Sequence, residues 1–417
     1  MIISFTVKNF KSIRDEQTLN LYAEKPNDIY CGNVAFPDKD GKIGILKTAG
    51  IYGANASGKS NLLEAFKALR RMVIFSSNWQ LDSKNPYYKP FRLNKVTRSA
   101  PSVFELDFIG MDKLRYTYRV EFSEYQIESE HLDYYPTARK VNLFERKTGS
   151  SGEFEFKAGN QLKGSRRIIP CLKNNLYLSK AANNEDGPLV IKNLYRQIRS
   201  GINVIGPNEL MINKQLKNDS YLKQLSMLLA CADTGISAVE RKKRKKSVEE
   251  EQPGFFAEIE YEPVFTHNGS EDKFSLKDES DGTKRLYDFA PLILISLPAG
   301  KTVIVDEIDN SLHPYLSEFI IKLFNDPETN PNNAQLIFAA HDISLMNQEY
   351  MRRDQFWFTD KNKEGATELY SLDEFSEARA NSPFAKWYTQ ERFGAVPEID
   401  FKRFKNMLIK ELEQRNE

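Results

Sequence analysis

The sequence predicts an α/β protein in which a mixed sheet with a glycine-rich loop is joined to an antiparallel β lobe. The loop, 53–60, follows an expected strand at 45–52 and precedes an amphipathic helix with the apolar stripe Leu62, Phe66, Leu69 and Val73. Apolar and polar residues alternate within 103–157, which favours antiparallel strands. The apolar runs 303–305 and 335–340 are typical of buried strands.

Size and composition narrow the class of protein. The chain has 417 residues, enough for two or three folding units. Its 59 basic and 58 acidic residues nearly cancel, so overall charge gives no argument for nucleic acid as an obligate partner. The three cysteines are far apart and form no disulfide framework or zinc motif. The longest apolar run, 290–297, is too short to span a bilayer. We therefore expect a soluble cytoplasmic protein with no membrane partner.

Changes of pattern along the chain suggest four segments. Ile3, Phe5 and Val7 alternate as in a strand, which opens the first lobe. We expect a first lobe with the antiparallel region, a helical insertion or arm, a second lobe and a helical C-terminal segment, at 1–184, 185–254, 255–375 and 376–417. In the last segment one helical face carries the apolar residues Phe401, Phe404, Leu408 and Leu412.

A charged run occupies 241–251, with six basic residues followed by serine, valine and three glutamates. We interpret it as a solvated loop, and a nucleic-acid contact is the alternative. A strand is expected to resume at 255–261, and a helix at 282–297.

The glycine-rich loop matches the pattern Gly-x-x-x-x-Gly-Lys-Ser in full. Its glycines allow backbone N–H groups to converge on phosphate oxygens, and the following helix points its positive end at the same anion. Lys59 is expected to reach the β and γ phosphates, and Ser60 to hold Mg²⁺. The candidate nucleotide ligands are Gly53, Asn55, Ser57, Gly58, Lys59, Ser60 and Asn61.

A second candidate site stands where the strand 303–305 ends in Asp306 and Glu307. In open α/β sheets ligands bind at the carboxyl ends of strands. Asp306 is placed to hold Mg²⁺ through water, and Glu307 to polarise an attacking water as a general base. On its own the pair is more typical of a plain turn at a strand end, but the phosphate loop favours the catalytic interpretation.

Three further short motifs can be explained by a structural role alone. Ser280 begins a Ser-x-Gly segment ending at Gly282 and is a good helix N-cap. Asp309 follows the carboxylate pair, and His341 ends the strand 335–340. A lone histidine at a strand end is more often a hydrogen-bonding residue than a catalytic one.

Taken in chain order, these motifs resemble the ABC-type ATPase head. The resemblance implies ATP and Mg²⁺ as cofactors, and a head-to-tail pair of subunits with ATP between them. Ser280 and Gly282 would then touch the γ-phosphate of the partner subunit's ATP, Asp309 would communicate across the interface, and His341 would sense the γ-phosphate. The family's glutamine that joins Mg²⁺ and water is not placed, and Gln126 and Gln161 are the candidates.

A closer resemblance concerns the family branch. Residues 5–13 are similar to the opening of recombination-repair and OLD-like ATPases, where a basic residue matching Lys11 lies near the nucleotide. The segments 52–61, 306–314 and 392–397 together resemble bacterial AAA15-type ATPases, which include the abortive-infection AbiL and RloA proteins and the ATPase of the PARIS anti-phage system.

The AAA15 resemblance implies a sensor or scaffold subunit of an anti-phage system, controlling a separate effector such as a TOPRIM or RloB-like nuclease encoded nearby. The alternative is a RecF-like DNA-maintenance ATPase that binds DNA when ATP is bound. The predicted insertion lacks the sustained heptads of a chromosome-scaffolding coiled coil. Residues 342–417 contain no evident Asp-x-Asp constellation, so we expect no nuclease within this chain.

Overall fold

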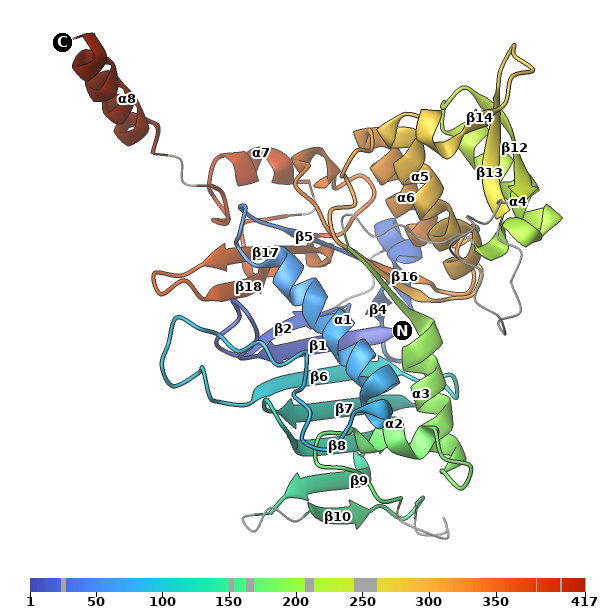
Figure 1. Ribbon diagram of the computed structural model, residues 1–417, viewed down its shortest axis with the longest axis vertical. Helices are drawn as coiled ribbons and strands as arrows, with labels where there is room; N and C mark the ends of the chain where they lie inside the picture. Colours follow the sequence, from blue (N-terminus) through green and yellow to red (C-terminus); the bar gives the residue numbers. More distant parts are fainter. Residues whose placement is uncertain are drawn as a thin grey trace, which may run out of the picture.

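The computed structural model describes residues 1–23, 28–149, 154–162, 169–206, 214–243, 261–379, 381–397 and 400–416. Two sheets and two hydrophobic cores organise the chain (Figure 1). The predicted α/β class, with a mixed sheet and an antiparallel lobe, is confirmed. No helix among the described residues is long and apolar enough to cross a membrane.

The antiparallel lobe is a seven-stranded sheet in the order β10-β9-β8-β7-β6-β1-β2. Its strands are β1 (Ile2–Lys8), β2 (Gln17–Asn20), β6 (Ser102–Ile109), β7 (Arg115–Phe122), β8 (Ile127–Tyr135), β9 (Val141–Thr148) and β10 (Phe154–Ala158). In β7 every second residue is buried, because successive side chains of a strand point to opposite faces. The alternating apolar residues that predicted this lobe therefore form the face of the sheet that packs in the core.

The second sheet has the order β11-β15-β16-β5-β17-β18, parallel except for its last pair. Its strands are β5 (Thr48–Tyr52), β11 (Ile202–Ile205), β15 (Thr302–Val305), β16 (Gln335–Ala339), β17 (Phe356–Lys361) and β18 (Thr367–Ser371). Because β5, β15 and β16 run parallel, their carboxyl ends meet at one edge. The glycine-rich loop, Asp306 and His341 therefore share that edge.

Several elements differ from the sequence prediction. The strand expected at 45–52 is split at Lys47 into β4 (Ile45–Leu46), which pairs with β3 (Val34–Ala35), and β5. The segment 185–254 contains helices, as expected, but also β11 and β12 (Ile236–Lys243). The edge strand β11 escaped prediction because four residues are too few to show a period.

A small third sheet joins β12, β13 (Tyr261–His267) and β14 (Phe274–Ser275). The charged run enters the described structure only at the end of β12, at 241–243, and its remainder, 244–251, lies outside the described residues. The predicted strand 255–261 also lies outside them, apart from Tyr261.

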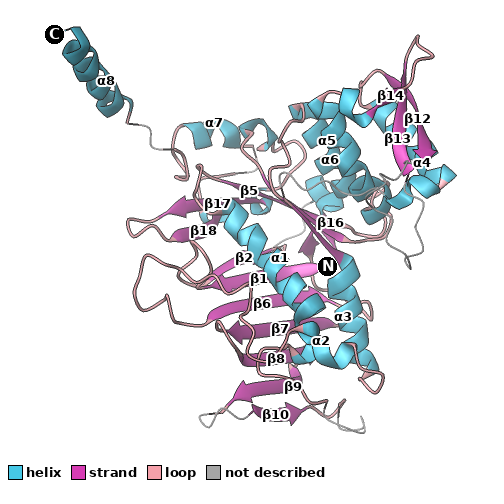
Figure 2. Cartoon of the chain, in the orientation of Figure 1, coloured by secondary structure: helices cyan, strands magenta, loops and turns pink. Residues whose placement is uncertain are grey.

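Helices cover both faces of the parallel sheet (Figure 2). The helices of the described residues are α1 (Lys59–Phe75), α2 (Tyr177–Ala182), α3 (Leu189–Gly201), α4 (Asp219–Cys231), α5 (Asp281–Pro291), α6 (Pro314–Asn325), α7 (Phe384–Thr389) and α8 (Phe401–Asn416), with a π-helical turn, Leu292–Ser296, directly after α5. Of these, α8 covers neither face of the sheet. Short 3₁₀ helices include Asp28–Asn33, Ser76–Asn78, Lys214–Lys217, Leu276–Asp278, Ile343–Leu345, Arg353–Gln355 and Leu372–Glu374.

Helix α1 lies between the two large sheets and belongs to the core that both share. Its predicted stripe is buried, and the ring of Phe66 stacks on Phe5 of β1 with centroids 3.7 Å apart. Stacked rings of this kind contribute beyond their buried area. The helix that begins at the glycine-rich loop is thus fixed to the antiparallel lobe.

We expect Phe66→Ala to lower the free energy of unfolding by about 3–5 kcal/mol, because it leaves a cavity between the sheets. Phe75→Ala at the exposed end of the same helix is the matched control, and we expect a change within about 0.5 kcal/mol. Urea denaturation of both variants checks this. Equal losses of unfolding free energy in the two variants would contradict the assigned role of α1 in holding the two lobes together.

Candidate functional site

The glycine-rich loop has a backbone shape that only glycine tolerates at two positions. Gly53 and Gly58 have φ angles of 149° and 121°. A Cβ atom at Gly53 would lie 2.3 Å from the carbonyl oxygen of Thr359, and one at Gly58 would lie 2.2 Å from the Thr367 hydroxyl. The loop is therefore pressed against β17 and β18, and both glycines are required by that contact.

A chain of hydrogen bonds braces the loop from below. The Asn61 amide donates to the Ser12 hydroxyl at 2.6 Å, which lies 2.8 Å from the Thr367 hydroxyl. Thr367 in turn donates to the carbonyl of Ser57 at 2.7 Å, so Ser12 must be the donor to Thr367. A second brace joins the Ser57 hydroxyl to that of Thr359 at 2.6 Å.

These contacts occupy the side chains of two predicted nucleotide ligands, whose contact with the nucleotide stays a prediction. Ser57 is buried and its hydroxyl is hydrogen-bonded to that of Thr359. Asn61 uses its amide on Ser12. We therefore assign both side chains to positioning the loop, whereas Asn55 and Ser60 are exposed at its surface. Thr359 and Thr367 had no sequence signal, because they meet the loop across some three hundred residues of chain.

Lys59 is held inside the loop. Its ammonium donates to the carbonyl oxygens of Gly53 at 2.7 Å and Ala54 at 3.2 Å. Burial lowers the pKa of Lys59, while the carboxylates of Asp306, Asp309 and Glu307 oppose this change. Both hydrogen-bond partners of this buried ammonium among the described residues are carbonyl oxygens, so it can donate instead to anionic oxygens, which form stronger charge-assisted hydrogen bonds.

Asp306 is a buried carboxyl group at the end of β15, facing the start of α1. Burial raises its pKa and so does the charge of Glu307, whereas a hydrogen bond from Ser60 and the charges of Lys59 and His341 lower it. Its Oδ1 atom has no hydrogen-bond partner among the described residues. A buried oxygen without a partner beside a serine hydroxyl is a donor set that suits Mg²⁺, which takes its other ligands from phosphate and water. The predicted metal pair, Ser60 and Asp306, is thus brought together.

A tight turn after β15 presents Glu307. This residue has a φ of 54°, a left-handed conformation that is rare for side chains other than glycine. Asn310 supports the turn, donating its backbone N–H to the carbonyl of Glu307 at 3.1 Å and its amide to Oε2 at 3.3 Å. Ile308 adds a backbone hydrogen bond to Ala339 of β16 at 3.0 Å. Stored strain of this kind is common at functional sites.

Asp309 and His341 are neighbours, as the motif order suggested. One oxygen of Asp309 accepts the backbone N–H groups of His341 at 2.8 Å and Asp342 at 2.6 Å. The other oxygen, Oδ1, is buried without a hydrogen-bond partner among the described residues. Within one chain Asp309 therefore ties the turn after β15 to the turn after β16. Its role across an interface stays a prediction.

Ser280 caps helix α5, accepting the backbone N–H of Thr283 at 3.1 Å, so the N-cap expectation is confirmed. It is exposed, and no hydrogen bond of the described residues joins Ser280 or Gly282 to the glycine-rich loop. A Cβ atom at Gly282 would lie 3.2 Å from the carbonyl of Ser311. The Ser-x-Gly segment therefore lies next to the turn that carries Ser311 and has no hydrogen bond to the glycine-rich loop among the described residues.

Helix α5 nevertheless contacts the turn after β15 through Arg285. This buried guanidinium lies 3.5 Å from the carbonyl of Glu307, over the ring of Phe289, with its Nε unpartnered among the described residues. One turn further on, burial raises the pKa of Asp288 to about 6, while the Arg285 charge opposes this rise. Arg285 thus links helix α5 to the turn that carries Glu307.

Lys11 lines a cavity of about 550 Å³ beside the loop, together with Ser12, Asn61, Lys89, Arg92 and Lys361. It forms an ion pair with Glu64, which also binds Lys89 at 3.0 Å. Burial lowers the pKa of Lys11 and so does Lys89, while Asp306 opposes this. A cationic cavity next to Asn61 is compatible with the expected place of Lys11 near a nucleotide, which stays a prediction.

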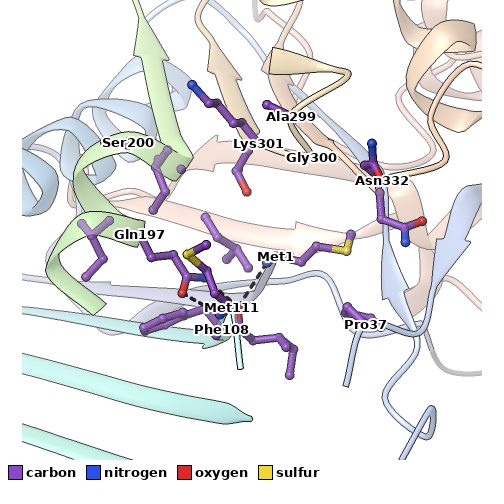
Figure 3. A pocket seen from close by; sticks show the side chains of 18 of the residues that line it. Met1, Pro37, Phe108, Met111, Gln197, Ser200, Ala299, Gly300, Lys301 and Asn332 are labelled. Carbon is purple, nitrogen blue, oxygen red and sulfur yellow. Dashed lines mark hydrogen bonds between the residues drawn. The ribbon is translucent and has the colours of Figure 1, made fainter. Parts of the chain in front are cut away.

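A second cavity, of about 540 Å³, lies at the other edge of the parallel sheet, where β15 and β11 begin (Figure 3). Met1, Phe108, Met111, Gln197, Lys301 and Asn332 are among its lining residues. Gln197 closes part of its wall by hydrogen bonds to the carbonyl of Ile109 at 2.8 Å and the N–H of Met111 at 3.1 Å. It contains no predicted site residue, so it is separate from the candidate site.

The structure does not identify the glutamine that, by resemblance to the ABC-type head, would join Mg²⁺ and water. Gln126 sits in the turn between β7 and β8 and donates to Glu128 at 2.9 Å. Gln161 is exposed after β10. Neither has a contact with the glycine-rich loop among the described residues.

Removal of the Thr367 hydroxyl tests whether its hydrogen bonds support the glycine-rich loop. We expect Thr367→Val to weaken ATP binding by about tenfold and to cost about 1–2 kcal/mol of stability, since two hydrogen bonds are lost at a buried site. Thr367→Ser keeps the hydroxyl and should bind nearly as the parent chain does. Calorimetric titration with ATP measures both variants. Unchanged affinity in Thr367→Val would show that the loop needs no support from β18.

Asp288 should give the protein a pH-dependent loss of stability. Its pKa of about 6 in the folded chain is above the ordinary 3.8, so the folded state holds the proton more tightly and stability falls as pH rises between these values. Asp288→Asn should therefore add about 1–3 kcal/mol at pH 8 and almost nothing at pH 4. Denaturation at both pH values checks this. A loss of stability at pH 8 would mean that the carboxylate is needed as a partner of Arg285.

Comparison with known proteins places the chain in a family. A family model described as "AAA domain, putative AbiEii toxin, Type IV TA system" matches residues 49–347. No curated protein matches the chain. Among solved structures, the SMC head domain from Thermotoga maritima is 16% identical, covers 89% of this chain and 98% of that chain, and has a TM-score of 0.40. The SmcHead bound to the C-winged helix domain of ScpA is 13% identical with the same coverage and a TM-score of 0.39. Because the family match spans well over half of the chain and encloses the glycine-rich loop, Asp306 and His341, the chain belongs to this AAA-domain family.

Proposed function

We propose that the chain binds ATP with Mg²⁺ and hydrolyses it at a site shared by two copies arranged head to tail. One observation carries this proposal. The chain contains a phosphate loop with a buried lysine and carboxylate, and an exposed helix start at Ser280, and no hydrogen bond among the described residues joins the two. A second copy would bring its Ser280 and Gly282 to the loop of the first.

The residues of the loop supply the binding of phosphate. The glycine conformations and the start of α1 turn backbone N–H groups outward, where an anion is favoured by the helix dipole. Lys59 can exchange its two carbonyl partners for phosphate oxygens without leaving the loop. Ser60 and the free oxygen of Asp306 would hold Mg²⁺, which neutralises charge on the β and γ phosphates when bound.

Glu307 is the residue placed to activate water. Its backbone conformation is fixed by Asn310 and by the hydrogen bond of Ile308 to β16, so its carboxylate projects beyond the strand end. A carboxylate there can accept a proton from a water aligned with the γ-phosphate. His341 lies at the next strand end, held by Asp309, where it can contact the same phosphate.

For the biological role, we infer a sensor or scaffold subunit of an anti-phage system in the cytoplasm. This rests on the AAA15-like segments and on the description of the matching family, which names a toxin of a toxin–antitoxin system. ATP would hold a closed pair of subunits, and hydrolysis would release it, which changes how a separate effector such as a TOPRIM or RloB-like nuclease is bound. Co-purification with the product of the adjacent open reading frame tests this role. A chain that purifies without any such protein, and protects no cell from phage, would contradict it.

A RecF-like role in DNA maintenance is the second candidate. The end of β12 presents Lys242 and Lys243 as exposed basic side chains, next to Arg241, which pairs with Asp219 at 2.6 Å. Binding through such lysines falls steeply with salt. ATP-dependent, salt-sensitive DNA binding would favour this role over the sensor.

Two substitutions separate chemistry from binding. Glu307→Gln should retain ATP but hydrolyse it at least about a hundredfold more slowly, because the general base is lost. Lys59→Ala should weaken ATP binding itself, because the buried cation is removed. Retention of labelled ATP and release of phosphate are measured on the same samples. Hydrolysis by Glu307→Gln at the parent rate would remove that residue from the proposed mechanism.

A further inference from the structure

Helix α8 stands clear of the rest of the chain (Figures 1 and 2). Its large apolar side chains are 42–70% exposed, and they are Phe401, Phe404, Met407, Leu408, Ile409 and Leu412. Among the described residues, no side-chain hydrogen bond, ion pair or ring contact joins α8 to either core. The predicted apolar stripe is therefore present, and neither core of the described residues covers it.

A helix in this position needs a partner. α8 has 16 residues, a length at which an isolated helix is only marginally stable in water. Helices of this length gain their stability from burial of one apolar face. The stripe at Phe401, Phe404, Leu408 and Leu412 has the spacing of a face that packs on another helix.

The charges along the helix indicate what that partner is. The sequence has four basic residues and no acidic one in 401–410, and three glutamates with one arginine in 411–417. Two copies laid side by side in the same direction would place basic half against basic half. Laid in opposite directions, each basic half would face the acidic half of the other copy. The helix is therefore complementary to itself only when antiparallel.

We propose that α8 pairs with α8 of a second copy in an antiparallel arrangement, independently of nucleotide. The contact is isologous, so each copy contributes the same residues and the pair closes on itself. Two helices of this length bury less area than a standard stable interface, so pairing by α8 alone is weak. Its effect is to raise the effective concentration of one ATPase head near another. This proposal does not rest on the proposed ATPase function.

The test is the molar mass of the full chain without nucleotide, measured by light scattering across a concentration series. We expect a reversible monomer–dimer equilibrium in the parent chain and in Lys59→Ala, because neither needs ATP to pair. Leu408→Asp should weaken dimerisation at least about tenfold, since it places a charge in the apolar seam. Asn406→Asp is the matched control, with the same charge added away from the stripe, and should dimerise as the parent does.

Charge reversal tests the orientation and the identity of the partner. Replacing Lys402, Arg403 and Lys405 by glutamate makes an acidic helix, and Glu411→Lys with Glu413→Lys makes a basic one. Each variant alone should be monomeric, and a mixture should form mixed dimers. A parent chain that stays monomeric throughout the series, or equal dimerisation of Leu408→Asp and Asn406→Asp, would overturn the proposal. So would binding to phosphatidylserine vesicles without self-association, which would identify α8 as a membrane-surface helix.

Thermal unfolding shows whether the variants fold. Because α8 contributes to neither core, Leu408→Asp should unfold at nearly the same temperature as the parent chain. If the parent chain dimerises but does not hydrolyse ATP, only the ATPase proposal is contradicted. If it hydrolyses ATP but does not dimerise through α8, only the α8 proposal is contradicted.

Discussion

The hydrogen-bond chain from Asn61 through Ser12 and Thr367 to Ser57 is the constraint on which the candidate site depends. A phosphate loop must hold backbone N–H groups toward open space before any anion arrives, which is unfavourable unless other contacts fix its shape. Here those contacts come from three distant parts of the chain. The loop, the opening hairpin and β18 must therefore all be folded before the site exists.

The edge of the parallel sheet that carries the candidate site also contains several groups that are unfavourable in the free chain. Lys59 and Asp306 are buried with incomplete partners, Asp306 and Asp309 each keep an oxygen without a hydrogen bond among the described residues, and Glu307 is held in a left-handed conformation. Each of these features lowers stability in the free chain. A bound phosphate and metal ion would satisfy most of them at once, so ligand binding should be coupled strongly to the order of this edge.

The sequence predicted the features that depend on local contacts and missed those that depend on contacts between distant parts of the chain. Local patterns found β1, α1, the antiparallel lobe and the strand ends at Asp306 and His341, because period and turn chemistry are local properties. The threonines that support the loop, Thr359 and Thr367, were missed because their contacts join β17 and β18 to a loop far away in the chain. Strand β11 was missed because it is short and depends on β15 for its pairing. The apolar stripe of α8 was predicted, but only the structure shows that neither core covers it.

The separation of Ser280 from the phosphate loop carries the proposal of a shared site, in which each chain would contribute half of two sites. Mixing two inactive variants tests it most directly. Lys59→Ala lacks the loop function and keeps Ser280, whereas Ser280→Arg keeps the loop and blocks the opposite half. In a mixed pair, the intact loop of one chain meets the intact Ser280 of the other. We expect hydrolysis, which is absent in each variant alone, to return on mixing. A mixture no more active than the sum of its parts would contradict a shared site.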